Sequence, residues 1–178
     1  PDWQAGGHGA TDVRRSLAWS VNTFYYYIGG GYKSFKGMGL ETLLTYFKNF
    51  KFGSHHHIDL PAESAGFVPS REWKSRELEE PWYVGDTYNL SIGQGHLLAT
   101  PLQVTNLTAA VANRGTLHQP HLLRAIADPQ SGEEQSMRYE PLAKNIANRD
   151  DLDVVARGMR DCVEYGSCRQ LASLPISI

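Results

Sequence analysis

The chain has 178 residues, which is the length of one domain and enough to bury a core. Hydrophobic residues make up 41% and charged residues 20%, as in an ordinary globular protein, and the net charge is −2. Lys and Arg form no cluster of the kind that nucleic-acid binders carry, so we set that class of partner aside. The apolar stretches are interrupted well before the roughly 20 residues that a membrane span needs. No signal peptide is visible at Pro1, and an opening on Pro rather than Met leads us to expect a fragment.

The first part of the sequence predicts two amphipathic helices. One begins near Thr11, a favourable N-cap, and continues to the glycines at 29–31. Its apolar residues recur at three- and four-residue steps and form one face: Val13, Leu17, Val21, Phe24 and Ile28. The other helix covers residues 40–50, ends before Gly53 and turns its apolar residues inward: Leu40, Leu43, Leu44, Phe47 and Phe50.

Residues 54–95 lack helical periodicity and are interrupted by prolines and glycines, which predicts a long irregular segment with one short helix. Such loops inside a compact domain are usually functional or held by their own packing. Trp73 and Trp82 are large enough to anchor this one.

The last part of the sequence mixes helices and strands. Thr100 caps a helix whose first residue is Pro101 and which ends at Gly115. The following segments predict a strand, a turn before a returning strand, a helix and a final β-prone stretch: 121–127, 128–132, 150–165 and 171–178.

Most catalytic and binding motifs are missing. The sequence contains no Gly-x-Ser-x-Gly, no His-Glu-x-x-His and no Gly-x-x-x-x-Gly-Lys-[Ser/Thr]. Leu98 stands where a dinucleotide-binding loop that starts at Gly93 needs its third glycine. We therefore expect no cofactor, and we assign residues 93–103 to structure alone.

Two groups of potential metal ligands favour a structural interpretation. His55, His56 and His57 are consecutive, so their side chains cannot all converge on one ion in regular structure, and an exposed polar turn is expected instead. Cys162 and Cys168 lack Cys-x-x-Cys spacing, so we expect two small thiols, buried or half-buried, rather than a zinc or redox site.

Ser20 and Asn22 are the candidate catalytic residues. They lie midway along the first predicted helix, where both side chains compete for backbone hydrogen bonds and can break the helix. After a break, the hydroxyl and the carboxamide would point the same way from a short connection, which suits a proton relay and the binding of a peptide carbonyl. On the tripeptide alone, a mid-helix pair without a function is the more common case.

Several short strings follow one another in a distinctive order. The first comprises Trp3, Gly6-Gly7-His8-Gly9, Asp12 and Ser20-Val21-Asn22-Thr23-Phe24-Tyr25. The later ones are Ile58-Asp59-Leu60-Pro61-Ala62-Glu63 with Gly66 and Pro69, Pro81-Trp82-Tyr83-Val84-Gly85-Asp86-Thr87, Ser91-Ile92-Gly93-Gln94-Gly95, Ala99-Thr100-Pro101-Leu102-Gln103, Ala112-Asn113 with Gly115, and Pro120-His121-Leu122. Together they resemble the transpeptidase domain of class B penicillin-binding proteins over nearly the whole chain. Ser70-Arg71-Glu72-Trp73-Lys74 looks most like the elongation subfamily, penicillin-binding protein 2.

The resemblance implies an α+β fold in which helices pack on an antiparallel sheet, with residues 1–178 as a predominantly helical part of the transpeptidase domain. Catalysis in this family uses three motifs: Ser-x-x-Lys, Ser-x-Asn and Lys-[Ser/Thr]-Gly. Only Ser-x-Asn occurs here, so the chain would start after the first motif and end before the third. We expect the chain alone to be inactive, because the nucleophilic serine and both motif lysines are absent.

By the same resemblance, Ser20 would shuttle a proton between the motif lysine and the leaving amine, and Asn22 would bind the peptide amide of the substrate. The intact protein would be a peptidoglycan D,D-transpeptidase that cross-links D-Ala-D-Ala stem peptides through a serine acyl-enzyme and is acylated by β-lactams. The family also implies an N-terminal anchor at the extracytoplasmic (periplasmic) face of the bacterial cytoplasmic membrane and elongation-complex membrane proteins as partners. Two alternatives remain: a non-catalytic scaffold of the same family, or a β-lactam hydrolase or receptor on the same fold.

Overall fold

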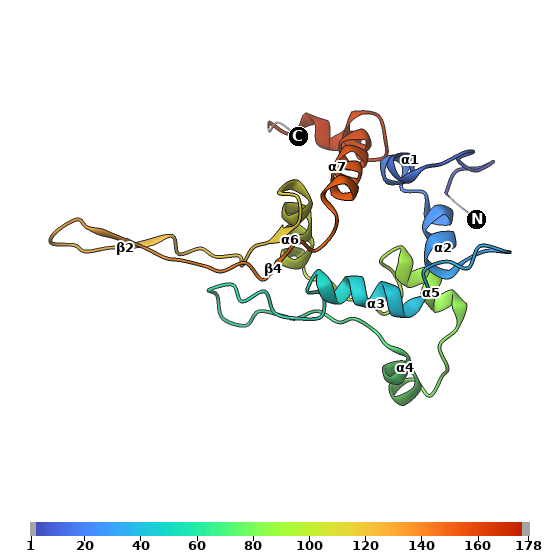
Figure 1. Ribbon diagram of the computed structural model, residues 1–178, viewed down its shortest axis with the longest axis horizontal. Helices are drawn as coiled ribbons and strands as arrows, with labels where there is room; N and C mark the ends of the chain where they lie inside the picture. Colours follow the sequence, from blue (N-terminus) through green and yellow to red (C-terminus); the bar gives the residue numbers. More distant parts are fainter. Residues whose placement is uncertain (1–2, 176–178) are drawn as a thin grey trace.

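The computed structural model describes residues 3–175 and shows a helix-rich α+β chain (Figure 1). Its helices are α1 (Val13–Trp19), α2 (Asn22–Gly30), α3 (Leu40–Asn49), α4 (Arg71–Glu77), α5 (Val84–Ser91), α6 (Pro101–Ala112), α7 (Arg149–Glu164) and the 3-10 helix η1 (Arg169–Ser173). The strands are β1 (Thr116–Leu117), β2 (Ala125–Ala127), β3 (Glu134–Ser136) and β4 (Ala143–Lys144). None of the helices that the structure describes combines the length and the apolar character needed to cross a membrane.

The helices pack in pairs that are distant in sequence. Helix α1 lies against α7, and α2 lies against α5, so that the α1–α2 connection joins two packed pairs (Figure 1). Strands β1 and β4 form a small antiparallel sheet beside α6, whereas β2 and β3 form an antiparallel arm that extends far from the helices. A small core of Ala110, Leu117 and Ile146 joins α6 to the β1–β4 sheet.

The first predicted helix is two helices in the structure, and the break falls at Ser20 and Val21. The Val21 N–H donates to the Ser16 carbonyl over 3.0 Å, and the Ser20 N–H donates to the Leu17 carbonyl over 3.4 Å. These two bonds form the paired arrangement that ends many helices with a left-handed residue. The helix is thus broken where the sequence suggested that it can break, but the backbone hydrogen bonds of the left-handed turn end α1, and the side chains of Ser20 and Asn22 take no part in them.

The helices predicted at residues 40–50, 100–115 and 150–165 are confirmed as α3, α6 and α7. Thr100 caps α6 as expected: its hydroxyl accepts the Gln103 N–H over 3.1 Å, and the Gln103 side chain accepts the Thr100 N–H over 3.0 Å. Helix α6 ends at Ala112 rather than Gly115, because the chain turns through a left-handed Arg114.

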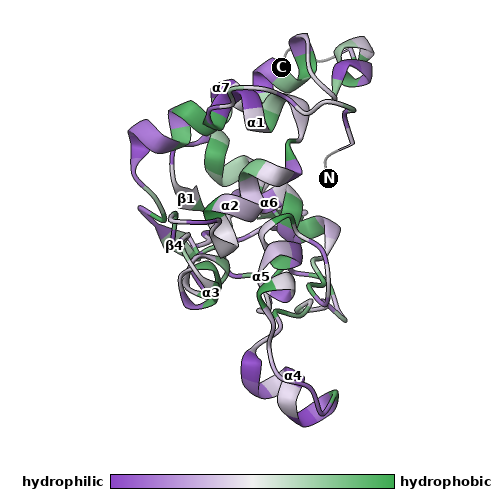
Figure 2. Ribbon diagram, turned by 90° about the vertical axis from the view of Figure 1, so that its right-hand side faces the viewer, coloured by the Kyte–Doolittle hydropathy of each residue, from purple (hydrophilic) through white to green (hydrophobic). Residues whose placement is uncertain are grey.

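The irregular segment contains two short helices, α4 and α5, where one was expected. Ser70 caps α4 through the Trp73 N–H, and the Asp86 carboxylate caps α5 by accepting the Tyr83 N–H over 2.8 Å. Helix α4 projects from the rest of the structure (Figure 2) and is attached by the 2.7 Å ion pair between Lys74 and Asp86. Sequence patterns missed one helix because each is only about two turns long.

Packing and buried polar groups hold this segment, as predicted. Trp73 packs against Phe67, and the Trp82 indole donates to the Thr87 hydroxyl over 2.9 Å. The buried Gln103 carboxamide donates to the carbonyls of Ser54 and Ala65, at 3.0 and 2.8 Å. The structural role expected for residues 93–103 thus includes a direct hydrogen-bonded link to the start of the loop.

The strand predicted at residues 121–127 is limited to Ala125–Ala127. The N–H groups of Leu122 and Leu123 instead donate to the Asp59 carboxylate, both over 2.8 Å, so they cannot pair with a neighbouring strand. The turn at 128–132 and the returning strand are confirmed by the pairing of β2 with β3.

The strand predicted at residues 171–178 is wrong where the structure describes it. Arg169–Ser173 form η1, and the Leu171 N–H donates to the Cys168 carbonyl over 2.9 Å. This local bond turns the chain back on itself instead of extending it. Residues 176–178 lie outside the described residues.

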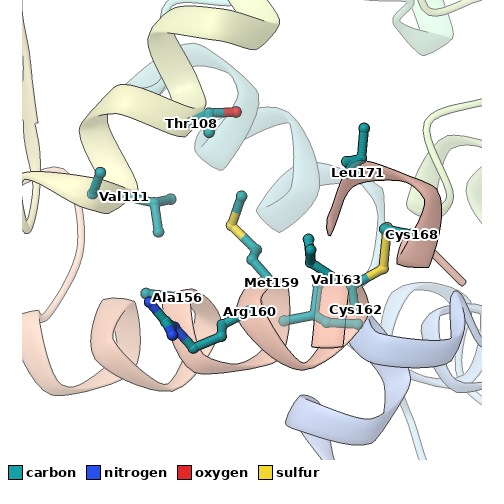
Figure 3. A pocket seen from close by; sticks show the side chains of 11 residues that line it. Thr108, Val111, Ala156, Met159, Arg160, Cys162, Val163, Cys168 and Leu171 are labelled. Atoms are coloured by element: carbon teal, nitrogen blue, oxygen red, sulfur yellow. A yellow bond between two sulfur atoms is a disulfide. The ribbon is translucent and has the colours of Figure 1, made fainter. Parts of the chain in front are cut away.

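The prediction of two separate thiols is also wrong, because Cys162 and Cys168 form a disulfide (Figure 3). Cys162 lies in the last turn of α7, and the chain reverses at Gly166, which brings the two Cα atoms to 5.0 Å. That separation is in the normal range for a disulfide. A six-residue spacing reveals nothing of this reversal.

The histidine run is not an exposed turn throughout. His56 is fully buried, whereas His55 and His57 are exposed. The Asn106 amide donates to His56 Nδ1 over 3.0 Å, which assigns the proton to Nε2, 3.3 Å from the Lys51 carbonyl. Backbone reversal at the left-handed His57 separates the three side chains, and the buried one links the loop to α6.

Burial lowers the pKa of His56, and this predicts a loss of stability at mildly acidic pH. Above about pH 6.5 the imidazole is neutral in both the folded and the unfolded chain, so its contribution is complete. Below that pH the unfolded chain binds the proton more readily, and the free energy of unfolding falls by up to about 1.4 kcal/mol per pH unit. In urea titrations at several pH values, His56→Gln should flatten this decline and His55→Gln should not; an equal decline in His56→Gln would contradict the assignment.

Candidate active site

Ser20 and Asn22 lie on the lining of one cavity of about 270 Å³, at the break between α1 and α2. The cavity also receives side chains from both helices and from the end of α5, and its lining is completed by Ser16, Leu17, Tyr25, Ser91 and Ile92. The structure therefore brings the two predicted residues to one cavity, as expected if the helix breaks between them.

Ser20 has left-handed backbone angles, with φ 54° and ψ 52°. Glycine is the usual residue at this position of a helix end, since a side chain costs about 1 kcal/mol there. Unfavourable backbone angles of this kind are concentrated at functional sites, where the side chain is needed. The exposed hydroxyl of Ser20 forms no hydrogen bond within residues 3–175 and is available to a ligand.

Asn22 is the first residue of α2, and its side chain is half-buried. Within the described part of the chain its carboxamide has no hydrogen-bond partner. A carboxamide offers both N–H donors and a carbonyl acceptor, so it can bind the two polar groups of a peptide bond. A free, half-buried amide on a cavity wall is suited to that purpose.

Two further residues with hydroxyl groups, Ser16 and Tyr25, line the same cavity. The Ser16 hydroxyl donates to the Val13 carbonyl over 2.8 Å and lies 3.0 Å from the Tyr25 hydroxyl. Because Ser16 has only one hydroxyl proton, the Tyr25 O–H donates to Ser16. Burial raises the pKa of Tyr25, so this O–H stays protonated at neutral pH.

Helix α7 fixes the position of α1. The Arg14 guanidinium binds the buried Asp161 carboxylate through two hydrogen bonds of 2.9 and 2.8 Å. The hydrogen bonds that Arg14 donates to Asp161 raise the pKa of Arg14, so its guanidinium stays charged. Gly158 lets the two helices approach closely, since a Cβ there would lie 2.7 Å from the Leu17 side chain.

Helix α5 is fixed to α2 in a similar way. The Tyr88 hydroxyl donates to the Gly31 carbonyl over 2.8 Å, and the Tyr88 ring packs beside the Tyr26 ring. This contact holds the end of α5 beside α2, where Ser91 and Ile92 complete the lining of the cavity.

The cavity can relay protons and bind an amide, but it holds no strong nucleophile. No lysine, histidine or cysteine is among its lining residues. The described residues also contain no group of three His, Cys, Asp or Glu side chains arranged to hold a metal ion. The arrangement therefore fits residues that assist a reaction whose attacking group comes from elsewhere.

Sequence reasoning missed Ser16 and Tyr25 as parts of the site. Their only sequence signal is their spacing: Ser16 precedes Ser20 by one helical turn, and Tyr25 follows Asn22 by nearly one turn. This spacing brings the side chains of Ser16, Ser20, Asn22 and Tyr25 to the same cavity, but it can be interpreted in this way only once the position of the helix break is known.

The family described as "Penicillin binding protein transpeptidase domain" matches residues 1–178. The chain belongs to this family. The similarity to its penicillin-binding protein 2 branch is also confirmed by the relatives that it matches.

Curated peptidoglycan D,D-transpeptidases align over most of the chain. It is 39% identical over 145 residues to the peptidoglycan D,D-transpeptidase MrdA of Escherichia coli (strain K12), which covers 82% of the chain and 22% of that relative. It is 34% identical over 170 residues to MrdA of Acinetobacter baumannii, which covers 94% of the chain and 24% of the relative. The chain thus spans less than a quarter of the length of these two relatives.

Solved penicillin-binding proteins share the fold. The structure of Pseudomonas aeruginosa PBP2 in complex with WCK 5153 is 30% identical, with a TM-score of 0.78, over 97% of this chain and 38% of that one. The Helicobacter pylori PBP2 in complex with MreC is 29% identical, with a TM-score of 0.71, over 92% of this chain and 28% of that one. The α+β fold class expected from the sequence is confirmed.

The left-handed conformation of Ser20 predicts that glycine at this position stabilises the protein. Ser20→Gly should raise the free energy of unfolding of the protein that carries this chain by about 1 kcal/mol, measured by urea denaturation, because glycine adopts these angles without a steric cost. Glu79→Gly, at another left-handed position (φ 55°) whose exposed side chain does not line the cavity, is the matched control and should stabilise similarly. A loss of stability in Ser20→Gly alone would show that the hydroxyl holds the turn.

Proposed function

We propose that this chain is part of a peptidoglycan D,D-transpeptidase and that Ser20 and Asn22 act in its active site. The observation that carries the proposal is the convergence of a free hydroxyl and a free carboxamide on one cavity, at the Ser-x-Asn motif of a chain from this family. The attacking serine and its lysine are assigned to a Ser-x-x-Lys motif outside residues 1–178, because the sequence contains none.

The two residues have different parts in this proposal. The Ser20 hydroxyl can accept a proton from one group while it donates its own to another, which allows transfer between the motif lysine and the leaving amine. The Asn22 carboxamide can donate to the carbonyl of the substrate peptide and accept from its N–H, which orients the bond to be broken. The reaction is the attack of a serine on a D-Ala-D-Ala peptide, release of D-alanine, and transfer of the acyl group to an amine of a neighbouring stem peptide.

The same proposal covers inhibition, location and partners. A β-lactam would acylate the attacking serine, since it resembles the substrate amide. The proposed location is the periplasmic face of the cytoplasmic membrane, through an anchor outside these residues. Membrane proteins of the elongation complex are proposed as partners, supported by the complex of the Helicobacter pylori relative with MreC.

Removing either side chain should slow acylation of the whole protein. We expect Ser20→Ala and Asn22→Ala each to lower the acylation rate by a fluorescent penicillin about 100- to 10,000-fold, as for the loss of a proton-transfer or orienting group. Ser136→Ala and Asn49→Ala, at exposed sites outside the cavity, are the matched controls. Acylation at the wild-type rate in Ser20→Ala or Asn22→Ala would refute the assigned roles.

The 178-residue chain by itself should remain unlabelled. It carries no Ser-x-x-Lys motif, so a fluorescent penicillin has no activated serine to acylate. The measurement is fluorescence of the denatured chain on a gel, with the full-length protein labelled in parallel. Stoichiometric covalent labelling of the isolated chain would mean that its own residues include the nucleophile.

A further inference from the structure

The loop that follows α7 lies against the end of α1, close to Ser20. It is closed by the Cys162–Cys168 disulfide and contains Gly166 and Ser167. It contacts α1 at Ala18, two residues before Ser20 and 149 positions before Ser167. Nothing in the proposed chemistry uses this loop.

The contact is centred on the Ala18 carbonyl. Ala18 is fully buried and lies in the last turn of α1, where carbonyl groups lack a partner within the helix. The Ser167 N–H donates to this carbonyl over 2.8 Å, and the Ser167 hydroxyl lies 3.3 Å from it. The loop thus supplies the hydrogen bonds that the end of α1 cannot make for itself.

Gly166 sets how closely the loop approaches. A Cβ at this position would overlap the Ala18 carbonyl oxygen and lie 2.9 Å from the Cys162 Cα, so no larger residue fits without a shift. Gly166 is buried, and its N–H donates to the Asp161 carbonyl over 3.0 Å. Gly166 therefore packs directly against the backbone of Ala18.

The disulfide restricts the conformations that the loop can adopt. Cys162 is buried in the last turn of α7. The Cys168 N–H also donates to the Cys162 carbonyl over 3.0 Å. The Cys162 sulfur lies 3.4 Å from the Ser167 hydroxyl. Figure 3 shows both cysteine side chains at the end of α7, beside Leu171 of η1. A closed ring of seven residues holds Ser167 against α1 with far less freedom than an open chain would.

The backbone around Ser20 needs support from the loop, because the Ser20 side chain makes no hydrogen bond that would hold it in place. Its hydroxyl has no hydrogen-bond partner in the described part of the chain, so its place in the cavity depends on the backbone between Ala18 and Val21. That backbone has an unfavourable left-handed residue at its centre, which persists only if its surroundings hold it.

We propose that the disulfide-closed loop is a positioning element for Ser20, acting through the Ala18 carbonyl. The inference rests on the proposed transpeptidase function. Opening the loop lets the end of α1 shift, and a displacement of about 1 Å at a reacting group can lower a rate about 100-fold. Efficient acylation would then require an oxidising environment, in which the disulfide stays formed.

The test uses the full-length protein and a fluorescent penicillin, with the limiting acylation rate and the half-saturating concentration measured separately. Gly166→Ala and the double variant Cys162→Ala/Cys168→Ala should each lower the limiting rate about 10- to 100-fold. Gly85→Ala is the matched control, because it introduces the same methyl group into open space in a helix. Dithiothreitol should slow the wild-type protein to the rate of the cysteine double variant and leave that variant unchanged.

A double-mutant cycle separates positioning from general destabilisation. Because the loop acts through Ser20, Gly166→Ala should have little further effect on the rate in a Ser20→Ala background, whereas independent damage would multiply the two losses. Wild-type limiting rates in both loop variants would overturn the inference, and so would fully multiplicative effects of Gly166→Ala and Ser20→Ala. In either case, slow acylation of Ser20→Ala alone would still support the proposed function. Absence of labelling in the wild-type protein would instead refute the proposed function itself. If Gly166→Ala does not fold, the cysteine variant and its reduction control decide the result.

Discussion

The site depends on one backbone feature, the left-handed turn at Ser20 that separates α1 from α2. The turn points a hydroxyl and a carboxamide into the same cavity, and a continuous helix could not do this because residues two apart lie on different faces. The turn is not held by the polar side chains that it presents. It is held from outside, by α7 on one side and by α5 on the other.

Much of this arrangement could be predicted from the sequence, and the reasons for success are local. The cap at Thr100 and the apolar spacing of α3 and α7 are encoded in a few neighbouring residues. The sequence also indicated that the helix can break at Ser20, although the break is made by backbone hydrogen bonds rather than by the side-chain competition that suggested it. The family assignment succeeded since short strings occur in order over nearly the whole chain.

The failures share a different cause, which is contact between residues far apart in sequence. Leu122 leaves its predicted strand because Asp59, 63 positions away, takes its N–H. His56 is buried because Asn106 of α6 provides a partner for it. The disulfide depends on a chain reversal at Gly166, which packs directly against the distant Ala18 carbonyl. No periodicity or spacing records these tertiary partners.

The close approach of Gly166 to Ala18 also constrains how this part of the molecule can change over time. Segments separated by almost the full length of the chain share one narrow contact, and the atom that a side chain at position 166 would meet is a backbone oxygen. Every residue at position 18 has this oxygen, so no substitution on α1 can make room for a larger residue in the loop. We therefore expect glycine to be retained at position 166 among homologous sequences, whatever residue stands at position 18.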